Sequence, residues 1–252
     1  MSASSDGGRV VVVTGGSRGI GRAACAAYAA RGDTVVIASR RAEACTALAA
    51  ELTAEHGTPA LGVGCHVGRW ADCDALVDRV LAEYGRIDVL VNNAGMSPLY
   101  GSLTEVTEEL FDKVLAVNLR GAYRLGARCG ELMAAAGGGA IVNVSSVAAV
   151  MPGPGELPYA LAKAGLNALT VGLARAYAPS VRVNTVMPGP VRTDIAEHWT
   201  EEFRTRIAGT VPAGRVGEAA EVVGAILYLT GPDAGYTTGA TIKVDGGMAW
   251  ST

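Results

Sequence analysis

A tyrosine and a lysine lie four residues apart in the segment Tyr159-Ala-Leu-Ala-Lys163. Pro158 precedes them and suits the first turn of a helix, and residues four apart on a helix lie on the same face. The pKa of a free phenol is about 10, so tyrosine exchanges protons poorly near neutral pH unless a neighbouring ammonium stabilises its phenolate. Such a pair can serve as a general acid and base. It also occurs by chance on protein surfaces, so its meaning depends on what surrounds it.

A glycine-rich turn follows the first apolar run of the chain. The segment Thr14-Gly-Gly-Ser-Arg-Gly-Ile-Gly21 lies between a predicted strand and a predicted helix. Glycines let the backbone approach a pyrophosphate, and a helix N-terminus offers free N–H groups. An ordinary tight turn is the alternative, but the place of this one between the first strand and the first helix favours dinucleotide binding. The predicted contacts in the turn are Gly15, Ser17, Arg18, Gly19, Ile20 and Gly21.

The end of the second predicted strand indicates which dinucleotide would bind. Sites that prefer NAD usually carry an acidic residue about 20 residues after the glycines, to bind the ribose hydroxyls. This chain has Ser39, Arg40 and Arg41 there. A guanidinium pairs with a 2′-phosphate instead, and Arg18 is placed to reach the same group. We therefore expect NADP(H) rather than NAD, with Ser39 and Arg40 as contacts. The alternative is that these arginines only begin a solvent-exposed helix. For Arg41 the two interpretations, phosphate contact and exposed helix start, are equally compatible with the sequence.

Seven apolar runs of strand length alternate with Ala/Leu-rich stretches at helical spacing. Several runs are unbroken, which is typical of strands covered on both faces. The alternation predicts an α/β fold with a Rossmann-type, doubly wound, seven-stranded parallel sheet and helices on both faces. Strands are expected at Val10–Thr14, Thr34–Ala38, Leu61–Val67, Ile87–Asn92, Ala140–Val144, Val181–Val186 and Thr241–Val244. Helices are expected at Ile20–Ala30, Ala42–Glu55, Ala71–Tyr84, Glu108–Ala136, Tyr159–Tyr177 and Ala219–Tyr228.

The 252 residues, 50% of them hydrophobic, suffice for a substantial core. No linker, repeat or shift of composition divides the chain. We expect a disordered tail over residues 1–8 and one domain over residues 9–252. The least regular part, about residues 190–217, is expected to be a substrate loop with a short amphipathic segment at Asp194–Ile207.

Composition argues against several classes of partner. The chain has a formal net charge of −3 and no long run of like charges. It therefore lacks the concentration of positive charge that is typical of nucleic-acid-binding proteins. No apolar stretch has the length of a membrane span and the first residues lack a signal-peptide core, so we expect a cytoplasmic protein that does not bind membranes. No Cys-x-x-Cys pair or Cys/His cluster is present, which predicts reduced thiols and no metal site. The cysteines are Cys25, Cys45, Cys65, Cys73 and Cys129.

Six motifs, in order along the chain, closely resemble those of the short-chain dehydrogenase/reductase family. They are the glycine turn, Asn92-Asn93-Ala94-Gly95, Asn118, Ser146, Tyr159 with Lys163, and Pro188-Gly189. The resemblance covers about Val10 to Gly247 and points to the NADP-preferring branch that includes 3-oxoacyl reductases. It implies an oxidoreductase that transfers a hydride between NADP(H) and a carbonyl or secondary alcohol. The catalytic residues it implies are Asn118, Ser146, Tyr159 and Lys163.

The resemblance also assigns roles within this catalytic set. Ser146, thirteen residues before Tyr159, would hold the substrate oxygen as a fixed hydrogen-bond donor, with its neighbour Ser145 structural. Tyr159 and Lys163 would also contact the cofactor, the lysine through the nicotinamide ribose. Asn118 would bind a water that relays protons to the tyrosine, although an asparagine tolerated inside a helix is the alternative.

Further cofactor contacts follow from the same resemblance. Asn93, Ala94 and Gly95 would line the adenosine and ribose, whereas Asn92 would tie neighbouring strands together. The segment with Pro188, Gly189, Val191 and Thr193 would hold the nicotinamide.

The residues after the third predicted strand depart from the family pattern. His66, followed by Val67, stands where an acidic residue usually contacts the adenine amino group. Neutral imidazole can accept that hydrogen bond or stack on the ring. We expect His66 to contact the adenine and Val67 to belong to the same cofactor site.

Three functions are compatible with these motifs. An active ketoreductase for a hydrophobic ketone or 3-oxoacyl-type substrate is favoured because the whole catalytic set is present. A non-catalytic NAD(P)-sensing protein and a methyltransferase on the same kind of sheet are the alternatives. The resemblance implies a homotetramer. Candidate walls of the substrate pocket are Ser97, Val147, Met151, Pro152, Ile195, Trp199 and Phe203.

Overall fold

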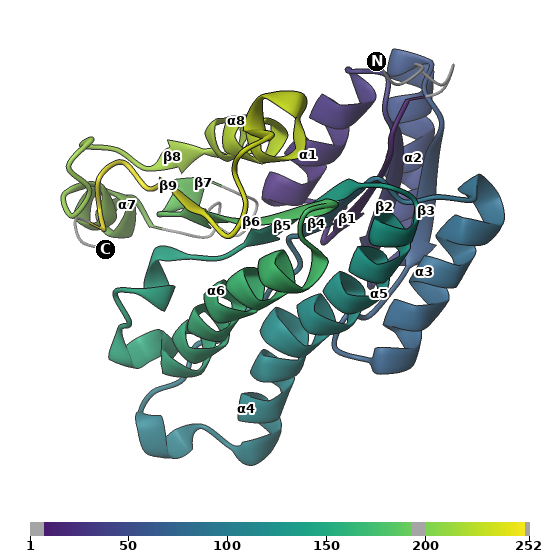
Figure 1. The fold of residues 1–252 in the computed structure, drawn as a ribbon. Helices are drawn as coiled ribbons and strands as arrows, with labels where there is room; N and C mark the ends of the chain where they lie inside the picture. Colours follow the sequence, from purple (N-terminus) through teal and green to yellow (C-terminus); the bar gives the residue numbers. More distant parts are fainter. Residues whose placement is uncertain (1–7, 193–199, 250–252) are drawn as a thin grey trace.

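The computed structural model describes residues 8–192 and 200–249. Within them, seven strands form one parallel sheet in the order β3-β2-β1-β4-β5-β6-β9 (Figure 1). The expected doubly wound Rossmann-type sheet is therefore confirmed. The strands are β1 Val10–Thr14, β2 Thr34–Ser39, β3 Ala60–Gly64, β4 Val89–Asn92, β5 Gly139–Val144, β6 Val181–Pro188 and β9 Thr241–Val244.

The strand order reverses direction at the centre of the sheet. From β1 the chain winds outward through β2 to β3, then returns to place β4 on the other side of β1. The crossovers after β1 and β4 therefore leave in opposite directions. Such a switch point opens a crevice at the carboxyl ends of the strands, where ligands of this kind of sheet bind.

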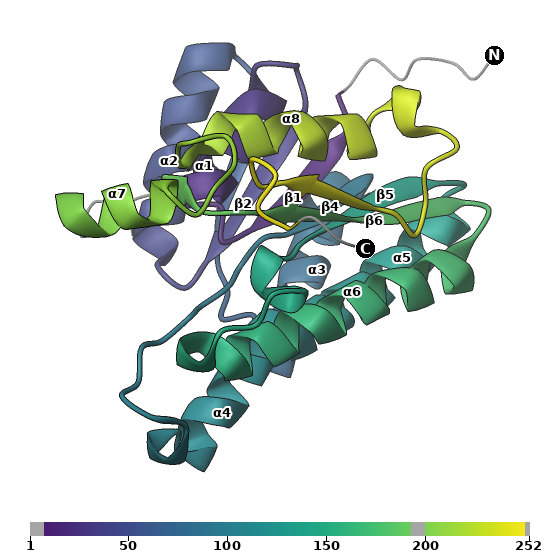
Figure 2. The same cartoon turned by 90° about the vertical axis from the view of Figure 1, so that its left-hand side faces the viewer.

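Helices cover both faces of the sheet (Figure 2). One core packs α1, α2 and α8 against alternate strand residues such as Val11 and Val13, and the other packs α3, α5 and α6 against residues such as Val10 and Val12. Because both faces are buried, the strands need no polar alternation, which explains their unbroken apolar runs. The helices are α1 Gly19–Ala29, α2 Ala42–His56, α3 Trp70–Tyr84, α4 Glu108–Leu115, α5 Gly121–Ala135, α6 Leu157–Tyr177, α7 Glu201–Ala208 and α8 Ala219–Thr230.

Two elements differ from the sequence prediction near the cleft. The third strand ends at Gly64, so the expected extension to Val67 is wrong, and Cys65 to Val67 instead form a loop at the sheet edge. The single helix expected at Glu108–Ala136 consists of α4, a π-helical turn at Ala116–Arg120 and α5. Such π-turns are frequent at functional sites.

The expected substrate loop has structured ends. Val191–Arg192 (β7) and Gly217–Glu218 (β8) pair in a small parallel sheet that the sequence did not predict. Of the amphipathic segment expected at Asp194–Ile207, the part from residue 201 belongs to α7. Residues 193–199 lie outside the described residues, as do residues 1–7 of the expected tail.

Candidate active site

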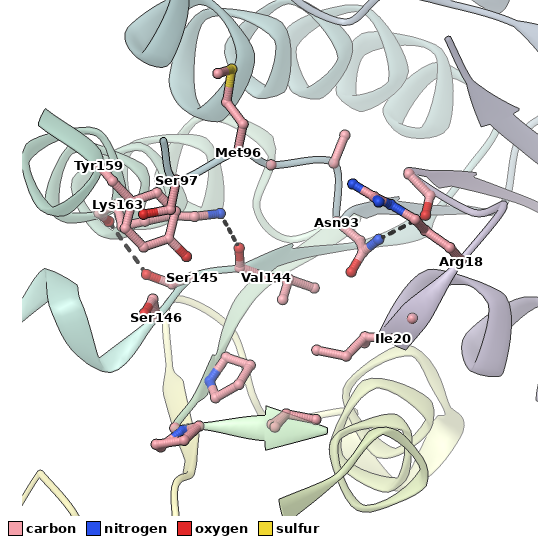
Figure 3. A pocket seen from close by; sticks show the side chains of 18 residues that line it. Arg18, Ile20, Asn93, Met96, Ser97, Val144, Ser145, Ser146, Tyr159 and Lys163 are labelled. Carbon is pink, nitrogen blue, oxygen red and sulfur yellow. Dashed lines mark hydrogen bonds between the residues drawn. The ribbon is translucent and has the colours of Figure 1, made fainter. Parts of the chain in front are cut away.

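Two adjoining pockets lie at the carboxyl ends of the central strands. One, of about 350 Å³, opens above β1, β4, β5 and β6 (Figure 3), and the other, of about 490 Å³, extends over β2 and the loop after β3. The pockets share part of their walls, so they form one cleft across the switch point. The shared residues are Gly15, Arg18, Ala94, Gly95 and Met96.

Most of the residues predicted from the sequence line this cleft. The predicted residues around the smaller pocket are Gly15, Arg18, Gly19, Ile20, Asn93, Ala94, Gly95, Ser97, Ser146, Tyr159, Lys163, Pro188, Gly189 and Val191. Those around the larger pocket are Gly15, Ser17, Arg18, Ser39, Arg40, His66, Val67, Ala94 and Gly95. Two predicted residues, Gly21 and Asn118, are buried behind the walls, and Thr193 lies outside the described residues.

The glycine turn is built by close backbone contacts. Gly15 has a φ of +65°, a conformation that residues with a Cβ rarely adopt. A Cβ at Gly21 would lie 2.3 Å from the carbonyl oxygen of Gly15, so only glycine fits where the helix packs against the turn. The Asn93 side chain donates hydrogen bonds to the carbonyl oxygens of Thr14 and Gly15, at 3.0 and 3.3 Å. The turn is thereby joined to the loop after β4.

Thr14 holds the same two segments together, a role that the sequence reasoning missed. Its hydroxyl donates to the carbonyl oxygen of Val91 at 3.3 Å and accepts from the backbone N–H groups of Asn93 and Ala94, at 3.0 and 3.1 Å. The side chain is buried. A buried polar residue at the last position of an otherwise apolar strand was the available signal, because such a group needs partners.

Asn92 ties neighbouring strands together, as predicted. Its Nδ2 donates to Oδ1 of Asn143 on β5 at 2.9 Å, and Asn143 in turn donates to Thr170 on α6 at 2.8 Å. These buried contacts fix the strand ends below the cleft and the helix that carries Tyr159.

Three arginines border the outer pocket. Arg18, Arg40 and Arg41 all line it and are exposed. Within residues 8–192 and 200–249, none of the three forms an ion pair with a carboxylate. Because guanidinium groups pair well with phosphate, three of them without a carboxylate partner make this end of the cleft suited to an anion.

His66 is held in one orientation by backbone contacts. Its ring Nδ1 accepts from the backbone N–H of Gly68 at 3.2 Å, and its backbone N–H donates to the Asp72 carboxylate at 3.0 Å. In the neutral ring Nε2 then carries the hydrogen and is a donor. The expected acceptor role toward an adenine amino group does not fit this arrangement, whereas stacking on the ring does.

Tyr159, Lys163 and Ser146 meet at the inner end of the cleft. The first two come from one face of α6, and Ser146 follows β5 (Figure 3). Ser146 Oγ accepts from the N–H of Ala148 at 3.2 Å, and its hydroxyl is close enough to the Tyr159 phenol to lower the phenol's pKa. Lys163 Nζ donates to the carbonyl oxygen of Val144 at 2.7 Å and lies 5.6 Å from the centre of the Tyr159 ring. The arrangement places a hydroxyl donor beside a phenol, with an amine behind the ring.

Burial dominates the electrostatics of this group. It raises the pKa of the Tyr159 phenol; the Ser146 hydroxyl opposes that rise and the Glu156 carboxylate adds to it. Burial also lowers the pKa of Lys163 to about 8. The expected lowering of the phenol pKa by Lys163 is not found in this geometry, because Nζ is directed to a strand carbonyl. Catalytic hydrogen bonds often tighten only when the ligands are bound.

The side chain of Asn118 is fully engaged in the π-helical turn. Its Nδ2 donates to the carbonyl oxygens of Met96 and Val114, both at 2.9 Å, and its Oδ1 accepts from the N–H of Met96 at 3.1 Å. A Cβ at Gly95 would lie 2.9 Å from that Oδ1. Asn118 therefore positions the segment that borders both pockets, and its role in a proton relay stays a prediction.

The remaining wall residues are less well predicted. Of the expected substrate walls only Ser97 lines the pocket, whereas Met151 and Pro152 are exposed and Val147 is half-buried outside the lining. Ile195, Trp199 and the side chain of Phe203 lie outside the described residues. Lining residues without a predicted role are Cys65, Met96, Val117, Val144 and Pro190. No group of residues that could hold a metal ion is found in the described part of the chain.

Comparison with known proteins assigns the chain to a family. Residues 15–249 match the family model described as enoyl-(acyl carrier protein) reductase. A relative from Bos taurus, dehydrogenase/reductase SDR family member 4, is 39% identical over 242 residues, which are 95% of this chain and 86% of the relative. The chain belongs to the short-chain dehydrogenase/reductase family. The resemblance stated from the motifs is thus confirmed.

Other members of the short-chain dehydrogenase/reductase family match over similar lengths. An L-rhamnose 1-dehydrogenase (NAD(P)(+)) from Azotobacter vinelandii is 38% identical over 95% of this chain and 96% of its own. The 3-oxoacyl-(acyl-carrier-protein) reductase of Escherichia coli is 35% identical over 96% and 97%. A crystal structure of a putative short-chain alcohol dehydrogenase from Sinorhizobium meliloti superposes with a TM-score of 0.90 at 33% identity, covering 98% of both chains. The chain is therefore an oxidoreductase of this family, whose members use a nicotinamide cofactor.

Proposed function

We propose that this chain is an NADP(H)-dependent reductase of a ketone, interconverting a carbonyl and a secondary alcohol. The observation that carries the proposal is the convergence of Ser146, Tyr159 and Lys163 on one end of a cleft whose other end is bordered by arginines. When bound, NADP(H) supplies or takes up the hydride. The chain's own residues must then bind the cofactor, orient the carbonyl and move one proton.

The residues present fit a dinucleotide phosphate. The cradle formed by Gly15 and Gly21 leaves no room for a Cβ, so the backbone of the turn can approach a pyrophosphate closely. Arg18 and Arg40 would bind the 2′-phosphate, with Arg41 as a third cation at the same rim. His66 would stack on the adenine, and Gly95 would allow the ribose to approach between Asn118 and Lys163.

Proton transfer would take place between Tyr159 and the substrate oxygen. The Ser146 hydroxyl would donate to that oxygen and hold it next to the phenol as negative charge develops. Because burial keeps the phenol protonated, Tyr159 would act as the acid in reduction. Lys163, still largely protonated at neutral pH, would stabilise the phenolate that remains.

The cofactor preference is testable by direct titration. We expect NADPH to bind more tightly than NADH by about tenfold or more, because each charge-assisted hydrogen bond to the 2′-phosphate contributes about 1.5–3 kcal/mol. Fluorescence titration of both dinucleotides against the purified protein measures the ratio. Equal or tighter binding of NADH would refute the assignment to Arg18 and Arg40.

The substrate class is proposed from the lining of the inner pocket. Beyond the reactive groups this lining includes Met96, Val144 and Pro190, which favours a hydrophobic ketone or a 3-oxoacyl-type substrate. One relative's name specifies a 3-oxoacyl-(acyl-carrier-protein) and another's L-rhamnose, so a panel of apolar ketones, 3-oxoacyl thioesters and sugars is the fitting test. If NADPH is oxidised most slowly with the apolar substrates of this panel, the proposed substrate class is contradicted.

The alternatives are weaker on specific grounds. A non-catalytic NAD(P)-sensing protein of the same fold would have no use for a serine, a tyrosine and a lysine arranged around one pocket. A methyltransferase would not need the Tyr159–Lys163 pair. If the purified protein reduces any carbonyl compound with NADPH, both alternative functions are excluded.

We further propose a homotetramer, a single domain over residues 9–252 and a cytoplasmic location. Exposed apolar side chains on α4 to α6 and around α8 support self-association, among them Phe111, Tyr123, Leu161 and Tyr228. No helix in the described part of the chain is long and apolar enough to span a membrane. Light scattering of the purified protein measures the assembly, and a monomer at micromolar concentration would contradict it.

A further inference from the structure

Two cysteine side chains lie at the two ends of one short loop behind the wall of the outer pocket. Cys65 follows β3 and lines that pocket, and Cys73 lies in the first turn of α3. Cys65 Sγ donates to the carbonyl oxygen of Asp72, next to Cys73, and Cys73 Sγ donates to that of Val67, two residues from Cys65. These crossed bonds bring the two side chains close together, and each shifts the pKa of the other. Cys65 is 3% exposed and Cys73 is fully buried, so the pocket side of Cys65 is where solvent reaches the pair. The proposed hydride transfer uses neither thiol.

The segment between the two cysteines forms the wall for the adenine end of the cleft. His66 and Val67 line the pocket. Backbone contacts hold this segment to the thiols: Cys73 Sγ donates to the carbonyl oxygen of Val67 at 3.3 Å, and Cys65 Sγ to that of Asp72 at 3.6 Å. A change at the sulfur atoms therefore acts directly on residues that face the dinucleotide.

The two sulfur atoms differ in reactivity in a way that suits a pair. Their mutual interaction raises the pKa of the Cys65 thiol and lowers that of Cys73. Cys73 is thus the better nucleophile of the two, because the thiolate is the attacking form. Cys65 is the sulfur that a small oxidant in the pocket meets first.

We propose that Cys65 and Cys73 form a reversible disulfide when a two-electron oxidant such as hydrogen peroxide enters the outer pocket, and that this disulfide weakens dinucleotide binding. Peroxide oxidises the Cys65 thiol to a sulfenic acid and is reduced to water. The Cys73 sulfur then attacks the Cys65 sulfur, the S–O bond breaks, and the oxygen leaves as a second water with the thiol proton. An external dithiol restores both thiols by exchange.

Disulfide formation must move the pocket wall. The sulfur atoms have to leave their carbonyl partners and approach each other to about 2.05 Å, which draws the start of α3 toward the end of β3. His66 and Val67 lie on the loop between them and shift with it. Conversely, a dinucleotide over this wall covers Cys65 and slows its oxidation. The two effects are reciprocal, because a ligand that favours the reduced form is bound less well by the oxidised form.

Peptide mapping of the intact protein tests the linkage. The protein is treated with hydrogen peroxide, the remaining thiols are blocked, and it is digested with trypsin without reductant. Cleavage after Arg69 separates residues 42–69, with Cys45 and Cys65, from residues 70–79, with Cys73, so only a disulfide joins these peptides. We expect the joined pair, its loss with dithiothreitol, and slower formation in saturating NADPH. Absence of the joined pair, or conversion of Cys65 to higher acids without it, overturns the proposal.

Variants identify the bond and its effect. Cys45→Ala, which removes the other thiol of the first peptide, should still give the joined peptides, whereas Cys73→Ala should not. Peroxide should lower the affinity of the wild type for NADPH by about tenfold and leave that of Cys73→Ala unchanged. A joined pair with unchanged affinity overturns the effect on binding. The linkage itself does not depend on the proposed function: if the untreated protein binds no NADPH, that function fails while the peptide map still decides the disulfide.

Discussion

Lys163 Nζ lies 5.6 Å from the centre of the Tyr159 ring and donates a hydrogen bond to the carbonyl oxygen of Val144 at 2.7 Å. The lysine is fully buried behind the phenol, and the strand carbonyl is its protein partner. This relationship links the proposed catalytic role of Lys163 to stability. Burying its ammonium group lowers the free energy of unfolding, a cost that an uncharged side chain at the same place would not have.

Lys163→Met is expected to abolish carbonyl reduction while stabilising the fold at pH 7. Burial lowers the lysine pKa from 10.5 to about 8, so the folded wild type holds the proton less tightly than the unfolded chain. The resulting cost, on the order of 1–3 kcal/mol, is fully present below pH 8 and declines as the pH rises toward 10.5. Denaturant unfolding of both proteins at pH 7 and pH 10 measures it. A wild type more stable than the variant at pH 7 would contradict the expectation.

Tyr159→Phe should reduce kcat by about 10² to 10⁴-fold, the usual contribution of a positioned general acid. The ring remains and only the hydroxyl is lost, so the affinity for NADPH should change by less than about twofold. Steady-state NADPH oxidation and fluorescence titration give the two values. If kcat is retained, another group must donate the proton.

Arg40→Asp should weaken NADPH binding by about 10 to 100-fold, because it replaces a cation beside the 2′-phosphate with an anion. NADH, which lacks that phosphate, should bind as well as before or better. Arg31→Asp, an exposed arginine outside both pockets, is the matched control for the change of charge. Equal losses for both dinucleotides would show that the substitution damaged the fold instead of the phosphate site.

Gly21→Ala should remove dinucleotide binding and destabilise the protein by about 1–3 kcal/mol, since its Cβ would lie 2.3 Å from the carbonyl oxygen of Gly15. Gly224→Ala, in the middle of α8 with open space around it, is the control. It should leave binding unchanged and raise stability by about 0.5–1 kcal/mol. Thermal unfolding with and without NADPH compares them, and a tolerated Gly21→Ala would mean that the turn can move.

The departures from the sequence prediction follow from contacts between distant segments. The motifs could be located along the chain because glycine turns and apolar strands have local signatures. A polar residue at the end of an apolar strand signals that the Thr14 hydroxyl needs a partner, but not that this partner is the loop after β4. Nothing at Asn118 indicates that it is bonded to Met96. The pKa of Lys163 also depends on burial, which spacing along a helix does not reveal.

By itself, the sequence determined the type of sheet, the position of the glycine turn and the candidates for reactive side chains, because these depend on residue type and short-range periodicity. Only the tertiary structure decided which of these residues share a pocket and which of them are buried. Those properties arise where β1, β4, β5 and β6 end side by side, and the packing of segments far apart in the chain sets the dielectric and the neighbours of each group.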